Sequence, residues 1–422
     1  KSPAIHGALN MIYRYGITED EAYAQKVYPY LRGVADFWEK DLVCRDGVYH
    51  VVGDGMHERT DGNIRDNGVP EDPVNTLGYL KTFFTWMPRI SEALDLDEKK
   101  REKWLEIAEN LAPYPKGTIR EIQENPTLWK EVDVKLEDLL PEEMLDKEIY
   151  YDEGIGGKWS FHFPGNVMQI YPGNAIGLGS APEELEVARN TVQIHALVEN
   201  ALGELEYRKA LEEAEFADKD NANNLLFNSN GELENGEAYS NGMESGGVKN
   251  PHFYKAGAFN ASNLSCLFFT AAVRVGYAPE IIWKEMRDMI LNRGIPNGFL
   301  KENPHGIEQL NTIPDAIQEM MLQSCEGMIR IFPVWPRAEH PNAFFRNFRA
   351  WGGLEVSAAL KDGEGERVSI LSHKGHPCRV ENPWPGKSVK VSYEYGRPDE
   401  VHFGEYLNIE LYKEEHAELF RI

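Results

Sequence analysis

The sequence has few cysteines, and their positions suggest neither a cross-linked framework nor a metal site. The 422 residues include four thiols, which lie far apart and form no CxxC pair: Cys44, Cys266, Cys325 and Cys378. Disulfide-rich domains and structural zinc sites depend on closely spaced cysteines. We therefore expect free thiols, no metal and no bound cofactor.

Long apolar runs and an excess of basic residues are also missing. Charged residues make up 27% of the chain and interrupt its apolar stretches, so none reaches the ~18–20 residues of a membrane span. Forty-four Lys and Arg face sixty-nine Asp and Glu, which leaves a net charge of −25 that repels phosphate backbones. Neither a membrane nor a nucleic acid is expected as a partner.

The usual motifs of several enzyme classes are absent. The sequence contains no Walker A, HExxH, GxSxG or helix-opening GxGxxG motif, so the common signals of phosphate, zinc-protease and serine-hydrolase chemistry are missing. The segment that begins at Asp218 is superficially similar to a calcium loop, but Asn223 stands where that loop needs glycine. We expect residues 218–250, rich in Asn and Gly, to form a long loop without calcium.

Helical patterns dominate residues 1–335. One helix is predicted to begin at the capping box Thr18-Glu19-Asp20-Glu21, and another at Ser180, with proline in its first turn. About nine helices are expected from apolar spacing. Beyond Pro333, Pro336 and Pro341 the pattern changes to alternation, which predicts a small antiparallel β-sandwich over residues 336–422.

Two acidic residues in polar loops are candidates for acid–base chemistry. Glu58 lies in the loop Gly53–Arg59, and Glu308 lies just before a helix expected to begin near Thr312. A carboxylate at a helix N-terminus is stabilised in its ionised form, which suits a base. A pair of carboxyl groups, one acid and one base, is what glycoside hydrolysis requires.

Several neighbouring residues have a structural interpretation as well. His57 and His305 can be hydrogen-bonding loop residues, and either glutamate can be a solvated surface charge. His195 falls on a helical apolar stripe and is expected to be a core histidine. The pair Met320-Met321 is expected to be core.

The later part of the chain contains a set of motifs that match one known family. They are Ile317-Gln318-Glu319-Met320-Met321-Leu322-Gln323-Ser324, Glu326-Gly327, Ile331-Phe332-Pro333, Arg349-Ala350-Trp351-Gly352-Gly353-Leu354-Glu355-Val356 and Leu371-Ser372-His373-Lys374-Gly375-His376-Pro377-Cys378-Arg379. Together these motifs resemble family 95 glycoside hydrolases, the α-L-fucosidases and α-L-galactosidases. With varying strength, including Tyr171-Pro172-Gly173, the resemblance covers nearly the whole chain.

The resemblance implies a fold and a reaction. It implies a mainly α protein with an (α/α)6 barrel, or helical toroid, followed by the β-sandwich. It also implies an inverting hydrolase that releases a terminal sugar, such as α-L-fucose or α-L-galactose, from an oligosaccharide or glycan. By position, Glu58 matches the general acid and Glu308 the general base. Further pocket residues by the same match are His57, His162, Asn166, His305 and Asn311.

The chain departs from the family at several of these positions. Glu308 replaces an Asp, and Gln309-Leu310-Asn311-Thr312 replaces the remainder of the motif around the base. The His-rich run of the family is here Phe161-His162-Phe163-Pro164-Gly165-Asn166. A pocket that hydrogen-bonds its sugar discriminates by unpaired polar groups, so we expect altered sugar specificity. The expected helices are fewer than twelve, which favours a toroid that is incomplete at its N-terminus and a fragment of a longer chain.

Two other functions stay open. A catalytically inactive glycan-binding protein of the same fold would explain the altered motifs at residues 161–166 and 309–312. A sugar phosphorylase would keep the acid and replace the base by phosphate, but no Arg, Lys or His cluster stands near either loop.

Overall fold

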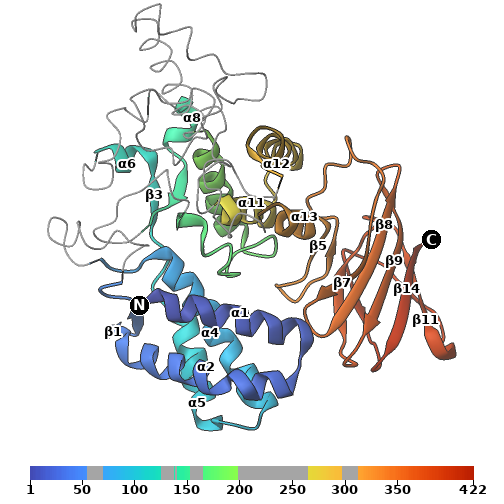
Figure 1. Ribbon diagram of the computed structural model, residues 1–422, viewed down its shortest axis with the longest axis horizontal. Helices are drawn as coiled ribbons and strands as arrows, with labels where there is room; N and C mark the ends of the chain where they lie inside the picture. Colours follow the sequence, from blue (N-terminus) through green and yellow to red (C-terminus); the bar gives the residue numbers. More distant parts are fainter. Residues whose placement is uncertain (55–69, 125–136, 138–139, 153–164, 198–264, 297–311) are drawn as a thin grey trace, which may run out of the picture.

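Helices and strands occupy different parts of the molecule. In the computed structural model, helices fill the N-terminal and central parts, and a large sheet at the C-terminal end stands beside them (Figure 1). The structure is 45% helical and 24% strand, with ten helices in its described part. That part comprises residues 1–54, 70–124, 137, 140–152, 165–197, 265–296 and 312–422.

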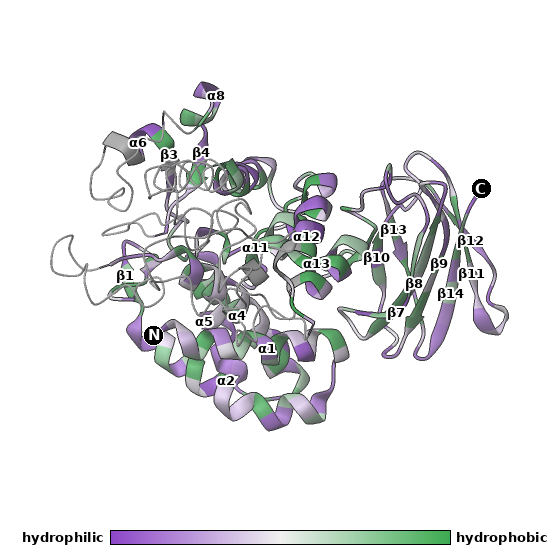
Figure 2. Ribbon diagram, turned by 45° about the horizontal axis from the view of Figure 1, so that its top comes forward, coloured by the Kyte–Doolittle hydropathy of each residue, from purple (hydrophilic) through white to green (hydrophobic). Residues whose placement is uncertain are grey.

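The first helical group surrounds an apolar cluster near the N-terminus. It consists of α1 (Ser2–Thr18), α2 (Glu21–Asp41), α4 (Val74–Ala93) and α5 (Glu98–Glu109), with the hairpin of β1 (Val43–Arg45) and β2 (Val48–His50). Trp38 and Trp104 are fully buried in this cluster. The buried residues of α1 include Ile5, Leu9 and Ile12, and Figure 2 shows hydrophobic and hydrophilic residues interspersed along α1 and α2.

The capping residue of α2 differs from the one expected. Asp20 precedes the helix, and its side chain accepts a hydrogen bond of 3.1 Å from the backbone N–H of Tyr23. Glu19 before it adopts a positive φ of 47° and ends α1. The predicted helix start is confirmed to within a few residues, but Asp20 is the N-cap, because Thr18 still belongs to α1.

The second helical group lies above the first group in the view of Figure 1, and its helix α13 lies next to the C-terminal strands. Its long members are helical residues 182–197, α11 (Ser265–Arg274), α12 (Pro279–Arg293) and α13 (Thr312–Met321). Short elements complete it: β3 (Lys116–Thr118), α6 (Ile119–Glu124), α8 (Glu142–Leu145), β4 (Glu148–Tyr150) and the 3-10 turn η2 (Gly165–Val167). β3 and β4 form an antiparallel pair.

The C-terminal part is a six-stranded antiparallel sheet in the order β12-β11-β14-β9-β8-β7. The strands are β7 (Ala343–Ala350), β8 (Leu354–Lys361), β9 (Glu364–Ser372), β11 (Val389–Tyr393), β12 (Glu400–His402) and β14 (Glu415–Arg421). Buried and less buried residues alternate along β8, so one face carries the core. The turn predicted at Asp362-Gly363 is confirmed: both residues have positive φ, 51° and 80°, and link β8 to β9.

Smaller strand pairs connect the sheet to the helices. β10 (Cys378–Glu381) pairs with β13 (Tyr406–Ile409), and β5 (Leu322–Gln323) pairs with β6 (Arg330–Ile331). Next to β6, Ile329 donates a hydrogen bond of 2.8 Å to the carbonyl of Arg379 at β10. The 3-10 turn η7 (Glu394–Gly396) follows β11. One apolar cluster accordingly continues from Phe268 on α11 through Phe332 to Val356 in the large sheet.

The predicted fold class is wrong. An (α/α)6 toroid does not appear in the described residues, which contain ten helices in two groups and a six-stranded antiparallel sheet in place of a mainly α toroid with a small sandwich. Apolar spacing shows which face of a helix is buried but not which helix covers it, so it cannot distinguish a toroid from another helical arrangement. The boundary predicted between residues 335 and 336 stays a prediction.

The helix α4 is buried on nearly every side, and at Gly78 it has no room for a side chain. A Cβ added to Gly78 would lie 2.6 Å from the Cα of Gln169, whereas a Cβ on Gly33 of α2 would meet no atom within 4 Å. Backbone therefore approaches backbone at Gly78, and Gly33 is an exposed helical glycine.

We expect opposite effects from the same substitution at these two glycines. Gly33→Ala should raise the free energy of unfolding by about 0.5–1 kcal/mol, because alanine loses less backbone entropy in a helix. Gly78→Ala should lower it by about 1–3 kcal/mol, because the backbone near Gln169 must move. Urea unfolding followed by circular dichroism measures both, and a Gly78→Ala protein as stable as Gly33→Ala would contradict the close approach.

Candidate functional site

The N-terminus of α4 meets the ends of two chain segments that carry predicted site residues. The backbone N–H of Val74 donates to the carbonyl of Asp152 at 2.9 Å. Thr76, in the first turn of the helix, donates through its hydroxyl to Asp54 at 2.8 Å. Asp54 and Asp152 are both 4% exposed, and Thr76 is fully buried. Three polar side chains are therefore held in the interior where α4 begins.

Two more buried polar side chains, Asn166 and His195, lie next to Tyr150 of β4. The Asn166 amide donates to the carbonyl of Tyr150 at 2.8 Å, and its oxygen is hydrogen-bonded to Nε2 of His195. The ring of His195 also meets the ring of Phe268 edge-on, with centroids 5.7 Å apart. We name Asp54, Thr76, Asp152, Asn166 and His195 the polar cluster.

Burial determines the charge of the histidine in this cluster. Removal from water lowers the pKa of His195 to about 3, because the interior disfavours the charged imidazolium. His195 is therefore neutral at ordinary pH. The interpretation of His195 as a core histidine agrees with its 1% exposure and its hydrogen bond to Asn166.

An ion pair lies between α11 and α13, beyond Phe268. Arg274 at the end of α11 contacts Glu319 of α13 with nitrogen–oxygen distances of 2.8 and 3.2 Å, and it lies over the ring of Tyr171 at 5.0 Å. Burial raises the pKa of the Glu319 carboxyl, and the Arg274 guanidinium opposes this rise. One turn earlier, Thr270 donates to Asp315 at 2.8 Å. These contacts fix α13 against α11.

Six of the seven predicted site residues lie outside the described part of the chain: Glu58, Glu308, His57, His162, His305 and Asn311. The seventh, Asn166, is fully buried, with both ends of its amide bonded to the protein. The structure does describe the residues that flank the predicted loops. Asp54 precedes the Glu58 loop, Asp152 precedes the His162 loop, and α13 follows the Glu308 loop.

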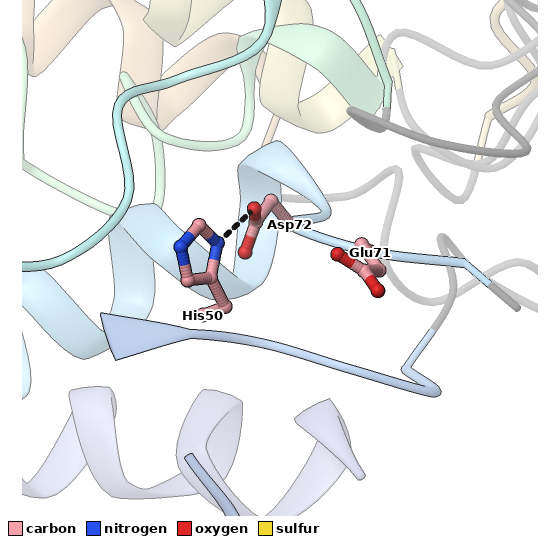
Figure 3. A group of neighbouring side chains, drawn as sticks. All are labelled: His50, Glu71 and Asp72. Atoms are coloured by element: carbon pink, nitrogen blue, oxygen red, sulfur yellow. Dashed lines mark hydrogen bonds and ion pairs between the residues drawn. The ribbon is translucent and has the colours of Figure 1, made fainter. Parts of the chain in front are cut away.

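A further group of possible metal-ligating side chains links β2 to the start of α4. His50, Glu71 and Asp72 offer ligand atoms within 4.8 Å of one another (Figure 3). Asp72 is already bonded at 2.8 Å to Nδ1 of His50, and Glu71 accepts two hydrogen bonds from Arg45, at 2.8 and 3.1 Å. These bonds engage one oxygen of Asp72 and both of Glu71, so the group acts as a bridge between segments.

These internal polar residues could not be predicted from local sequence patterns. Asp54, Thr76 and Asp152 lie far apart in the chain and belong to no spacing pattern. Arg274 and Glu319 are 45 residues apart, and each can be a surface charge in a helix. A buried contact between such residues depends on the packing of α4, β4 and α11, which local periodicity does not contain.

Comparison with known proteins gives no assignment. No family model matches the chain, and a search of the curated proteins finds no match to it.

The neutral histidine predicts a loss of stability in acid. The folded-state pKa of His195 is lowered to about 3 from the ordinary 6.5, so the stability it confers is present above pH 6.5 and is lost as the pH falls toward 3. Between pH 7 and 5 the wild type should lose about 2 kcal/mol more than His195→Gln, which cannot titrate. Urea unfolding at the two pH values measures the difference, and equal losses would contradict the assignment.

The buried ion pair predicts a strong effect of removing one partner. Arg274→Met leaves the Glu319 carboxylate without its guanidinium and should lower the free energy of unfolding by about 3–5 kcal/mol. The double variant Arg274→Met/Glu319→Gln should be more stable than the single variant, because no uncompensated charge is buried. Thermal denaturation of the single and double variants compares them, and additive losses would show that the pair is not coupled.

Proposed function

We propose that the protein is an inverting glycoside hydrolase that releases a terminal sugar, such as α-L-fucose or α-L-galactose, from an oligosaccharide or glycan. In this proposal Glu58 is the general acid and Glu308 the general base. The sugar is contacted by His57, His162, His305 and Asn311. Asn166 is buried and supports the residues that contact the sugar. The proposal rests on the family resemblance of the sequence and on the arrangement of the residues that flank the predicted loops.

The single observation that supports it is the convergence of these flanks. Asp54 is bonded to Thr76, and Asp152 to Val74, so the beginnings of the Glu58 and His162 loops both attach at the first turn of α4. Asn166, after the His162 loop, is bonded to His195, which contacts α11 through Phe268. Segments far apart in the sequence are thus anchored to one buried cluster.

Only a short stretch of chain separates Glu58, the proposed acid, from the anchored residue Asp54. Glu58 follows Asp54 by four residues, so covalent geometry keeps its Cα within about 14 Å of that of Asp54, at ~3.6 Å per residue. The same limit applies to Glu308, four residues before α13 begins at Thr312. An inverting mechanism needs the two carboxyl groups roughly 6.5–9.5 Å apart, so that a water molecule fits between the base and the sugar.

The neighbourhood of α13 favours a base at Glu308. Free backbone N–H groups and the dipole at a helix N-terminus stabilise a carboxylate in its ionised form. α13 is fixed against α11 by the Thr270–Asp315 and Arg274–Glu319 contacts. The N-terminus of α13 therefore has a fixed position, close in sequence to the proposed base. An ionised base would then take a proton from the attacking water while the acid protonates the leaving oxygen.

Substitution of the acid should affect substrates according to their leaving group. Glu58→Gln should lower kcat/KM on an oligosaccharide by about 10²–10⁴-fold, because the leaving oxygen receives no proton, and much less on a dinitrophenyl glycoside, which needs none. Glu308→Gln should lower both, because every substrate needs the activated water. Glu183→Gln, an exposed charge at the start of helical residues 182–197, is the matched control.

The outcomes separate hydrolysis from its alternative. Product configuration is followed by proton NMR on the glycosides of both sugars, and inversion is expected. Near-native turnover by Glu58→Gln would remove that residue from the role of acid. Sugar binding by calorimetry without turnover in the wild-type protein would instead support an inactive glycan-binding protein.

A further inference from the structure

A hollow of about 450 Å³ separates the first helical group from the C-terminal strands. One wall is a stripe of α4 formed by Lys81, Thr85, Trp86 and Arg89. The opposite wall comes from the turn after β5, the β7–β8 turn and the start of β10. None of its described lining residues belongs to the polar cluster or to the Arg274–Glu319 pair.

Two arginines in this hollow are held by aromatic rings instead of by carboxylates. The guanidinium of Arg89 lies 4.9 Å from the ring centre of Trp86, and that of Arg379 lies 4.3 Å from the ring centre of Tyr406. Within the described part of the chain neither forms an ion pair, although acidic residues outnumber basic ones by 25. Stacking leaves the N–H edge of a guanidinium available for a planar anion.

The carboxylates of the hollow, by contrast, are already engaged. Glu326 accepts hydrogen bonds from the backbone N–H of Gly179 at 3.0 and 3.1 Å and is paired with Arg330. Glu19 lies 2.8 Å from Nε2 of His376. The charge left over for a ligand is therefore positive, in a protein whose overall charge would repel anions elsewhere.

Uncharged groups in the hollow add both donors and acceptors. The buried Oδ1 of Asn174 has no hydrogen-bond donor among the described residues. The Thr85 hydroxyl donates to the Lys81 carbonyl and keeps its lone pairs, whereas the Ser324 hydroxyl accepts from the N–H of Trp351 and keeps its hydrogen. A ligand with several hydroxyl groups satisfies this mixture, and a carboxylate satisfies the guanidinium groups.

The size of the hollow and its rigid rim agree with a small ligand. A volume of about 450 Å³ is within the range of small-molecule sites and suits one sugar ring with bound water. Trp86 and Trp351 lie with ring centroids 4.9 Å apart, and Trp351 contacts α1 closely enough that Gly16 has no room for a side chain. The aromatic part of the wall is thus formed before any ligand arrives.

We propose that this hollow binds a carboxylated monosaccharide, with Arg89 and Arg379 holding the carboxylate and Asn174, Thr85 and Ser324 meeting the hydroxyl groups. The inference is independent of the proposed hydrolysis, since it uses none of the residues assigned to that reaction. It predicts a site that selects for negative charge on a sugar.

The test compares two sugars that differ only at C6, where one has a carboxylate and the other a hydroxymethyl group. D-galacturonate and D-galactose are titrated onto the full chain by calorimetry up to about 20 mM, at low and at high salt. Galacturonate should bind in the millimolar range, at least about tenfold more tightly than galactose, and more weakly at high salt. The double variant Glu58→Gln/Glu308→Gln should retain this binding, which separates the hollow from the proposed reaction site.

Variants locate the site. Arg89→Gln and Arg379→Gln should each weaken galacturonate binding by about tenfold or more. Arg346→Gln is the matched control, because Arg346 also stacks on an aromatic ring, that of Phe344 at 5.3 Å, but lies outside the hollow. Thermal denaturation checks that the variants are folded.

Four results would overturn the inference. They are the absence of saturable galacturonate binding, equal binding of galactose, unchanged binding in both Arg89→Gln and Arg379→Gln, or an equal loss in Arg346→Gln. The first two concern the wild-type protein and do not depend on whether a variant folds.

Discussion

The close approach of α4 to the segment that follows η2 is the contact on which the arrangement of the molecule depends. Gly78 meets the backbone of Gln169, and just before it Val74 and Thr76 in the first turn of the helix are bonded to Asp152 and Asp54. α4 also packs against α1, α2 and α5, so a single helix belongs to the first helical group and anchors the second. Its position determines where the Glu58 and His162 loops begin.

This constraint explains why α4 carries polar residues at unusual places. A helix that is covered on nearly all sides is expected to be apolar all round, yet Asn75, Thr76, Thr82 and Ser91 are buried in it. Thr76 and Thr82 donate hydrogen bonds to Asp54 and to the carbonyl of Gly173, so they tie the helix to its neighbours. The exposed stripe that remains, from Lys81 to Arg89, faces the hollow. One helix thus supports both proposals, through two different faces.

The two proposals rest on different kinds of support. The glycosidase proposal combines a resemblance in sequence with the convergence of loop flanks on the polar cluster. The binding proposal uses described side chains alone: two guanidinium groups without carboxylate partners among the described residues, and an amide oxygen without a donor there. A large negative charge makes such a pair of arginines unusual, since a carboxylate partner is easily found in this chain.

Local patterns were sufficient for the elements themselves. Apolar spacing at 3.6 residues located α2, α4 and α13, and alternation located β8, β9 and β11, because both periodicities follow from backbone geometry alone. Local patterns did not determine how the helices are arranged, because helices with one apolar face can be assembled in several ways and the choice depends on contacts between distant residues.

The residues of the candidate site were likewise predicted only in part. Glu58 and Glu308 can be recognised as candidates from their loops. The contacts of Asp54 with Thr76, of Arg274 with Glu319 and of Arg379 with Tyr406 were decided by the tertiary structure, because each joins residues that are far apart in the sequence and share no local signal. Arg89 stacks on Trp86 within α4, but the hollow that both residues line forms where α4 faces the C-terminal strands.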